Sequence, residues 1–239
     1  MAEKDYKKKI EFDADGERFY ETGVKNVVLY LKKNLTTDEN PKPYNNGVAW
    51  NGVTSISENP SGAETTKLYA DDIAYLSLTS NEEFGATIEA YMSPEEFDVC
   101  DGSADLADGV SIGQQKREVF GLAYKTVYGN DEDGNDKGYK LHLVYGAKAA
   151  PSSRAYATIN ESPEAITLSW ELTTTPVPVT GKKPTAIITI DSTKADPEKL
   201  AALEEILYGK DPTSEGASDG VEPRLPLPDE IATLMTKAS

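Results

Sequence analysis

The residue types that most often perform catalysis or bind metals are scarce in this sequence. Its 239 residues include one histidine, His142, and one cysteine, Cys100. No second histidine is present to complete a zinc site, and the acidic neighbours of Cys100 are expected to raise the pKa of its thiol. Phosphate-binding loops and the GxSxG, HExxH and GxGxxG motifs are missing. We therefore predict no catalytic residues, no cofactor and no metal site, and we expect that the protein is not an enzyme.

One cluster of oxygen-bearing side chains could suggest calcium. Asp131, Asp133, Asn135 and Asp136 crowd a short segment between two predicted strands. An EF-hand loop that began at Asp131 would need glycine at its sixth position and glutamate at its twelfth, where this chain has Asp136 and His142. The sequence therefore predicts an exposed polar turn here.

The charge of the chain is strongly acidic and unevenly distributed. Acidic residues number 41 against 24 basic ones, for a net charge of −17, and residues 34–110 alone hold 15 acidic and 2 basic residues. A chain with this net negative charge is not expected to bind nucleic acid or an anionic membrane surface, because both carry negative charge themselves. Two interpretations of the acidic segment remain open: a solvated face, or a surface selected to repel phosphate.

The composition also indicates where the protein is synthesised and whether it can form a sizeable core. One cysteine excludes an intrachain disulfide. The first residues, MAEKDYKKK, are charged and do not resemble a secretory signal. No run approaches the roughly 20 apolar residues of a membrane helix. We expect a protein without a membrane segment that is synthesised in a cytoplasm and has a sizeable core.

Alternating apolar residues predict that the elements are mainly strands. Residues 24–31 are apolar on both faces, so this strand should be covered on both sides. Residues 84–92 should form a half-buried strand whose wet face carries Thr87, Glu89 and Tyr91. Further strands are predicted at 68–80 (one strand or a bent pair), 118–128 with 139–146 as a hairpin, 165–173 and 185–191.

One helix is clearly signalled, over residues 197–208. Asp196 is a suitable N-cap, Pro197 a suitable first residue, and Gly209 a suitable residue after the C-terminus. Residues 210–224 are typical of a flexible linker, and the apolar tail after them is expected to dock on this chain or on a neighbour.

Residues 34–66 are rich in Asn, Pro, Gly, Ser and Thr, which favours a long loop with at most a short strand at 53–57. The segment also contains Tyr44 and Trp50, and disordered linkers are poor in aromatic residues. We therefore interpret it as a contact loop.

Several long blocks of sequence, in order along the chain, carry a resemblance to a known family. These blocks are GVKNVVLYLK, GVAWNGVTSISENPSGAE, LYADDIAYLSLTSNEEFGATIEAYMSPEEF, DGSADLADGVSIGQQKR, GNDEDGNDKGYKLHLVYGAKAAPS, INESPEAITLSWELTTTPV, DSTKADPEKLAALEEILYG and LPLPDEI. Together they resemble the major tail tube proteins of long-tailed phages with non-contractile tails, the siphophage type. The resemblance spans roughly residues 19 to 231, and the lysine-rich start and the segment 210–224 match least.

The resemblance implies a mainly β fold: a tail-tube-type β-sandwich or barrel with one flanking α-helix (197–208), a long inter-strand loop and extended terminal arms. Residues 1–209 would form the tube domain, and 210–239 a linker and arm. The chain would assemble into stacked hexameric rings, the tail tube of a virion, through which the genome passes without specific binding. Tape-measure, tail terminator and distal tail proteins would be its partners.

Residue assignments follow from the same resemblance. The loop 34–66 would reach a neighbouring ring, which makes Tyr44, Trp50 and Val53 the expected contact residues. Thr87, Glu89 and Tyr91 are our candidates for lining the lumen, where acidic groups would repel DNA. The alternative function is a soluble β-sandwich binding module for carbohydrate, in which Tyr44 and Trp50 would form the sugar platform.

Overall fold

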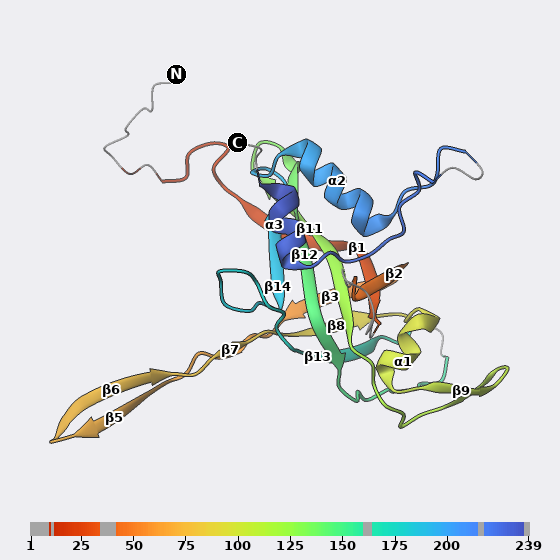
Figure 1. The fold of residues 1–239 in the computed structure, drawn as a ribbon, viewed down its shortest axis with the longest axis horizontal. Coiled ribbons are helices and arrows are strands. Elements are labelled where there is room, and N and C mark those ends of the chain that lie inside the picture. Colours follow the sequence, from red (N-terminus) through yellow and green to blue (C-terminus); the bar gives the residue numbers. More distant parts are fainter. Residues whose placement is uncertain (1–9, 11, 34–41, 160–163, 215–217, 237–239) are drawn as a thin grey trace.

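The computed structural model of the chain describes residues 10, 12–33, 42–159, 164–214 and 218–236. The fold is mainly β, as the sequence predicted, and is built on one large antiparallel sheet (Figure 1). Hydrogen bonds connect its strands in the order β2-β1-β11-β12-β13-β8-β3, and β14 also pairs with β12. These strands are β1 (Tyr20–Lys32), β2 (Tyr44–Ala49), β3 (Val53–Glu58), β8 (Gly85–Ala90), β11 (Phe120–Asn130), β12 (Gly134–Ala149), β13 (Leu168–Thr174) and β14 (Ile187–Asp191).

Smaller elements extend from this sheet. Three two-stranded ribbons are formed by β4 (Ser61–Gly62) with β7 (Glu82–Glu83), β5 (Thr65–Ala70) with β6 (Ile73–Thr79), and β9 (Ala104–Ala107) with β10 (Val110–Ile112). The helices are a one-turn α1 (Asp98–Asp101), which follows a 3-10 turn at Glu95–Phe97, then α2 (Pro197–Tyr208) and α3 (Pro228–Met235).

The sheet separates two apolar clusters. The first cluster contains a group of aromatic rings, with Trp50 4.5 Å from Phe97 and 5.4 Å from Trp170 between ring centroids. It is lined by inward-facing residues of β1, β8, β11, β12 and β13. The sheet curls around this cluster, so that β1 and β3 come close together although they are not paired.

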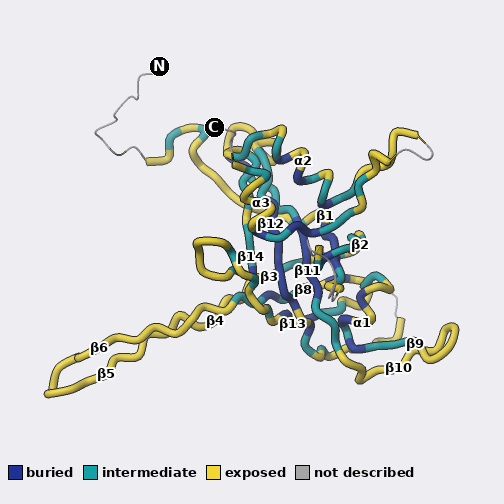
Figure 2. The backbone as a smooth tube through the Cα atoms, viewed as in Figure 1, coloured by how far each residue is buried: buried dark blue, intermediate teal, exposed yellow. Residues whose placement is uncertain are grey.

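The second cluster lies on the other face of the sheet, beneath α2 and α3 (Figure 2). Strand β1 contributes Leu29 to the first cluster and Tyr30 to the second, which confirms that this strand is covered on both sides. The Tyr30 hydroxyl donates a hydrogen bond to the Leu207 carbonyl oxygen at 2.7 Å. That bond ties the end of α2 to the sheet and satisfies a polar group that burial would otherwise penalise.

Helix α2 has the predicted bounds and the predicted cap. The Asp196 side chain accepts a hydrogen bond from the Glu198 amide at 3.1 Å, and Pro197 begins the helix. Its buried residues are Leu200, Leu203 and Leu207, spaced to form one stripe against the sheet.

The chain after α2 folds back onto the domain that precedes it. Leu225 and Ile231 are buried in the second cluster, and α3 is a second flanking helix where the sequence predicted only one. The Pro223 carbonyl accepts from the Gly47 amide at 3.0 Å, and the Tyr44 carbonyl accepts from the Leu225 amide at 3.1 Å. This segment therefore covers the outer edge of β2, an edge that would otherwise be open to pairing.

The prediction of a long loop over 34–66 is wrong for residues 44–49, which form a strand, whereas the short strand expected at 53–57 is confirmed as β3. Residues 34–41 lie outside the described residues, but 44–49 and 53–58 are strands of the main sheet. Pairing of β2 with β1 and of β3 with β8 determines this outcome, because tertiary context overrides a weak local β-propensity.

Candidate assembly surfaces

The most exposed regular element is the hairpin of β5 and β6, which we call the long hairpin (residues 65–79). It projects far from the body, on a stalk formed by β4 and β7 (Figures 1 and 2). Every residue of both strands is exposed. The turn consists of Asp71 and Asp72, with φ of 52° and 61°, as in the tight turns that match strand twist. The segment 68–80 is thus the bent pair of strands that the sequence allowed.

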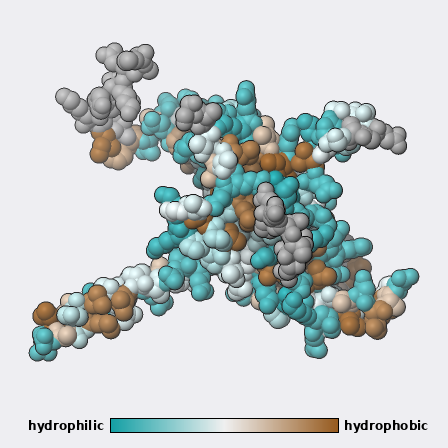
Figure 3. All heavy atoms as spheres, in the orientation of Figure 1, coloured by the Kyte–Doolittle hydropathy of each residue, from teal (hydrophilic) through white to brown (hydrophobic). Residues whose placement is uncertain are grey.

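The long hairpin is apolar although it is exposed. Leu68 lies opposite Leu76 in the register, and Leu78 lies further along the same face. At the outer end, Tyr69 is 70% exposed and Ile73 64%. Figure 3 shows this hydrophobic surface on the projecting arm. A two-stranded ribbon is marginal in water, and monomers rarely expose such patches, so this surface is suited to a protein partner.

A second, shorter hairpin, β9–β10, projects elsewhere from the lower half of the molecule as drawn in Figure 1. It exposes Leu106 and Val110. Its base is held by Asp101 of α1, which receives a hydrogen bond from Arg117 at 3.2 Å and also pairs with Arg154. The charged pair with Arg117 is largely buried, so it fixes the base more firmly than a surface ion pair does.

The predicted wet face of 84–92 is present on β8. Ala86, Ile88 and Ala90 are buried, whereas Glu89 is exposed, which confirms the half-buried strand. Glu89 accepts a hydrogen bond from the Ser55 hydroxyl at 2.9 Å, and the Thr87 hydroxyl accepts one from Asn59 at 2.9 Å. Tyr91, just beyond the strand, is 54% exposed.

Neighbouring strands extend this face. The register places Ser55, Glu89 and Ser169 side by side, and likewise Ser57, Thr87 and Glu171. The result is a patch of hydroxyl groups and carboxylates across β3, β8 and β13, bordered by Lys148 of β12 opposite Thr173. Such a face attracts neither apolar partners nor polyanions.

The residues predicted to contact a neighbouring ring lie mostly inside the chain. Tyr44 is 1% exposed and Trp50 2%, and Val53 packs against the first cluster. The Tyr44 hydroxyl accepts from the Gly146 amide at 2.9 Å, and Trp50 Nε1 donates to the Met92 carbonyl at 2.9 Å. The assignment of Tyr44 and Trp50 as surface contacts, and as a sugar platform, is therefore wrong, because both rings are core residues with satisfied polar atoms.

His142 lies in a polar cluster between β1 and β3. Its ring stacks on Tyr124 at 4.7 Å, its Nε2 lies 2.9 Å from the Thr126 hydroxyl, and Nδ1 lies 3.7 Å from Glu58. Glu21 lies 3.5 Å from Nε2 and also pairs with Lys140. Carboxylates from β1 and β3 thus flank opposite sides of one imidazole and connect the two unpaired strands.

This cluster predicts that stability depends on pH. Burial lowers the pKa of His142 below its ordinary value of 6.5, although Glu58 and Glu21 act in the opposite direction. The unfolded chain therefore binds a proton before the folded chain does, and the free energy of unfolding should fall as the pH drops below about 6.5. We expect His142→Gln to flatten this dependence in urea titrations between pH 7.5 and 5. Equal slopes for variant and parent chain would contradict the interpretation.

No metal or membrane element is evident in the described parts of the chain. No group of three or more His, Cys, Asp or Glu side chains there could hold a metal ion. None of the helices seen among these residues is long and apolar enough to cross a membrane.

Comparison with known proteins finds a likeness among solved structures only. No protein-family model matches the chain, and no significant match is found among curated proteins. Among solved structures, one similar chain comes from an extracellular contractile injection system, the PVC sheath-tube complex in the extended state. It is 12% identical, with a TM-score of 0.37, and the match covers 70% of this chain and 88% of that one.

Proposed function

We propose that this chain is a structural virion protein of the siphophage type that assembles into stacked hexameric rings, the tail tube for genome delivery. The observation that carries the proposal is the long hairpin, which exposes Leu68, Tyr69, Ile73 and Leu76 on a stalk outside the body. An arm of this kind gains stability only against a partner, and a repeating assembly supplies one for every copy.

The hexameric ring comes from the sequence resemblance, as do the proposed partners: a tape-measure protein, a tail terminator and a distal tail protein. Contacts between rings, first assigned to Tyr44, Trp50 and Val53, are reassigned here to the projecting hairpins. The burial of Tyr44 and Trp50 also removes the platform on which the carbohydrate-binding alternative relied.

Sedimentation velocity at rising concentration tests the assembly. We expect the 25.9 kDa monomer to give way to ring-sized and then larger species as concentration increases. A single monomeric boundary up to millimolar concentration would exclude self-assembly as the function of this chain.

We further propose that the hydroxyl and carboxylate face of β8 lines the channel. Glu89 and Glu171 lie on this face, and with a net charge of −17 on each copy a ring would repel the phosphates of passing DNA. Neither side chain belongs to an apolar cluster. A chain that carries both Glu89→Lys and Glu171→Lys should therefore still assemble.

The effect is measured as the rate of DNA ejection from phage carrying these variants, which we expect to fall at low salt and recover as salt screens the new charges. The matched control reverses two acids of the C-terminal segment, Asp211 and Glu222, both exposed. Equal ejection rates for both double variants would contradict the lumen assignment.

A further inference from the structure

A cavity lies where β1 departs from regular strand geometry. Gly23 and Asn26 have φ of 67° and 54°, and the pairing of β1 with β11 shifts register twice, between Thr22 and Lys25 and between Lys25 and Val28. Strand β2 pairs with β1 only from Val28 onward. The irregular part of β1, the β2–β3 turn and the end of α2 therefore border an open hollow of about 620 Å³, which we call the β1 pocket.

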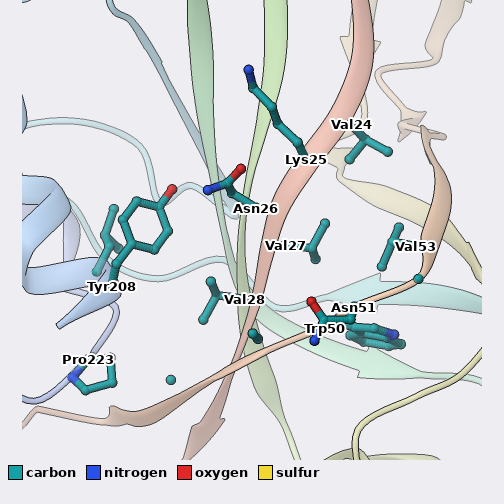
Figure 4. A pocket seen from close by; sticks show the side chains of 14 residues that line it. Val24, Lys25, Asn26, Val27, Val28, Trp50, Asn51, Val53, Tyr208 and Pro223 are labelled. Carbon is teal, nitrogen blue, oxygen red and sulfur yellow. The ribbon is translucent and has the colours of Figure 1, made fainter.

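The lining of the β1 pocket is unusual for so acidic a chain. It contains no carboxylate, and its one charged residue is Lys25. The remainder is mainly small and apolar: Val24, Val27, Val28, Gly47, Ala49, Trp50, Gly52, Val53, Leu207 and Pro223, with Asn26, Asn51 and Tyr208 as polar members. Figure 4 shows Val24, Val27 and Val53 around the space, with Lys25 at its edge.

Lys25 is also available for a partner. It forms no ion pair with any residue that the structure describes, whereas nearby Lys125 pairs with Glu204 at 2.8 Å. The volume of the pocket is that of a site for a few large side chains or a small ligand. A partner for it should therefore present apolar side chains next to a negative charge.

The tip of the long hairpin has this composition. Asp71 and Asp72 form the turn, and Tyr69, Ile73 and Tyr75 flank it, each at least 64% exposed. The hairpin projects away from its own body, so its tip and its own pocket are apart (Figure 1). The complementary surface must belong to another molecule.

We propose that the β1 pocket of one copy receives the tip of the long hairpin of a second copy, with Ile73 and a tyrosine in the hollow and Asp71 or Asp72 beside Lys25. This inference rests on the proposed self-assembly and specifies its contact. Hairpin tip and pocket are different surfaces of the same chain, so the contact is head-to-tail and leaves a free tip and a free pocket at its ends. Such a contact closes into rings or continues along a filament.

Engineered disulfides test the contact directly. Ala49→Cys places a thiol on an exposed position of the pocket, and Ile73→Cys places one at the tip. The native thiol does not interfere, because Cys100 is buried and burial raises its pKa to about 12. When the two variants are mixed under assembly conditions and mildly oxidised, we expect a large share of the protein to form covalent heterodimers, and neither variant alone to do so.

A matched control replaces the pocket thiol by Lys182→Cys, an exposed position in another turn. It should give at least tenfold less heterodimer, since a disulfide needs Cα atoms within about 7 Å.

Two further variants test the shape and the charge of the pocket. Ala49→Phe should fill the pocket and raise the concentration needed for assembly at least tenfold. Lys25→Asp should also raise the concentration needed for assembly at least tenfold. Combining it with Asp71→Lys and Asp72→Lys should restore the value of the parent chain.

The outcomes separate the two proposals. Polymers from the parent chain that show no specific cross-link and tolerate Ala49→Phe would overturn the pocket contact and leave the tube assignment in place. Failure of the parent chain to polymerise at any concentration would overturn both.

Discussion

Replacing residues 63–81 by an Asn-Gly turn is expected to abolish polymer formation and to leave the monomer folded. The change closes the pair formed by Gly62 and Glu82 with a two-residue turn of the type that joins antiparallel strands. Every residue of β5 and β6 is exposed, and none belongs to either apolar cluster. The free energy of unfolding should therefore change by only about 0.5 kcal/mol.

Two measurements check this expectation. Urea unfolding followed by circular dichroism reports the stability of the shortened chain, and light scattering reports its assembly. Leu76→Ser provides a milder variant that keeps the hairpin and removes one side chain of its apolar face. Polymers of normal length from the shortened chain would show that the long hairpin is not an assembly contact.

Trp50→Ala is expected to destabilise the monomer by about 3–5 kcal/mol, a large fraction of the stability of a typical domain. The indole packs against both Phe97 and Trp170, and its Nε1 donates to the Met92 carbonyl. Truncation would leave a cavity in the centre of the first cluster and orphan one carbonyl oxygen. Chemical denaturation at a concentration too low for assembly gives the value.

Tyr69→Ala is the matched control, because it truncates an aromatic side chain that is 70% exposed on the long hairpin. It should change the free energy of unfolding by no more than about 0.5 kcal/mol and should weaken assembly. A Trp50→Ala monomer as stable as the parent chain would contradict the assignment of Trp50 to the core.

Local periodicity was sufficient to predict several elements. The stripe of Leu200, Leu203 and Leu207 and the cap at Asp196 predicted α2, and the alternation around Ile88 predicted which face of β8 is buried. These predictions succeeded because the signal lies within one turn of helix or a few residues of strand.

The errors arose where distant residues determine the structure. Strand β2 is rich in Asn and Gly, and it forms because β1 offers an edge to pair with, which no local pattern reveals. Likewise, the apolar alternation of Leu76 and Leu78 is the same in a buried strand and in a projecting arm. Only the absence of a covering layer in the structure distinguishes the two.

Helix α3 had a local signal that could have predicted it. Pro228 stands at its first position, Asp229 and Glu230 occupy the first turn, and Ile231 with Leu234 faces the second cluster. A proline followed by acidic residues and an apolar pair at helical spacing is a typical helix start. The β1 pocket had no such signal, because it depends on a bulge in β1 and on the end of α2 and the β2–β3 turn lining the same hollow.

Negative-stain electron microscopy of the purified chain at high concentration tests the central claim most directly. We predict rings in axial view and tubes in side view, with a hollow centre and a regular axial repeat, and we predict that the chain with residues 63–81 replaced shows neither. Fields of separate compact particles from the parent chain at every concentration would contradict the account.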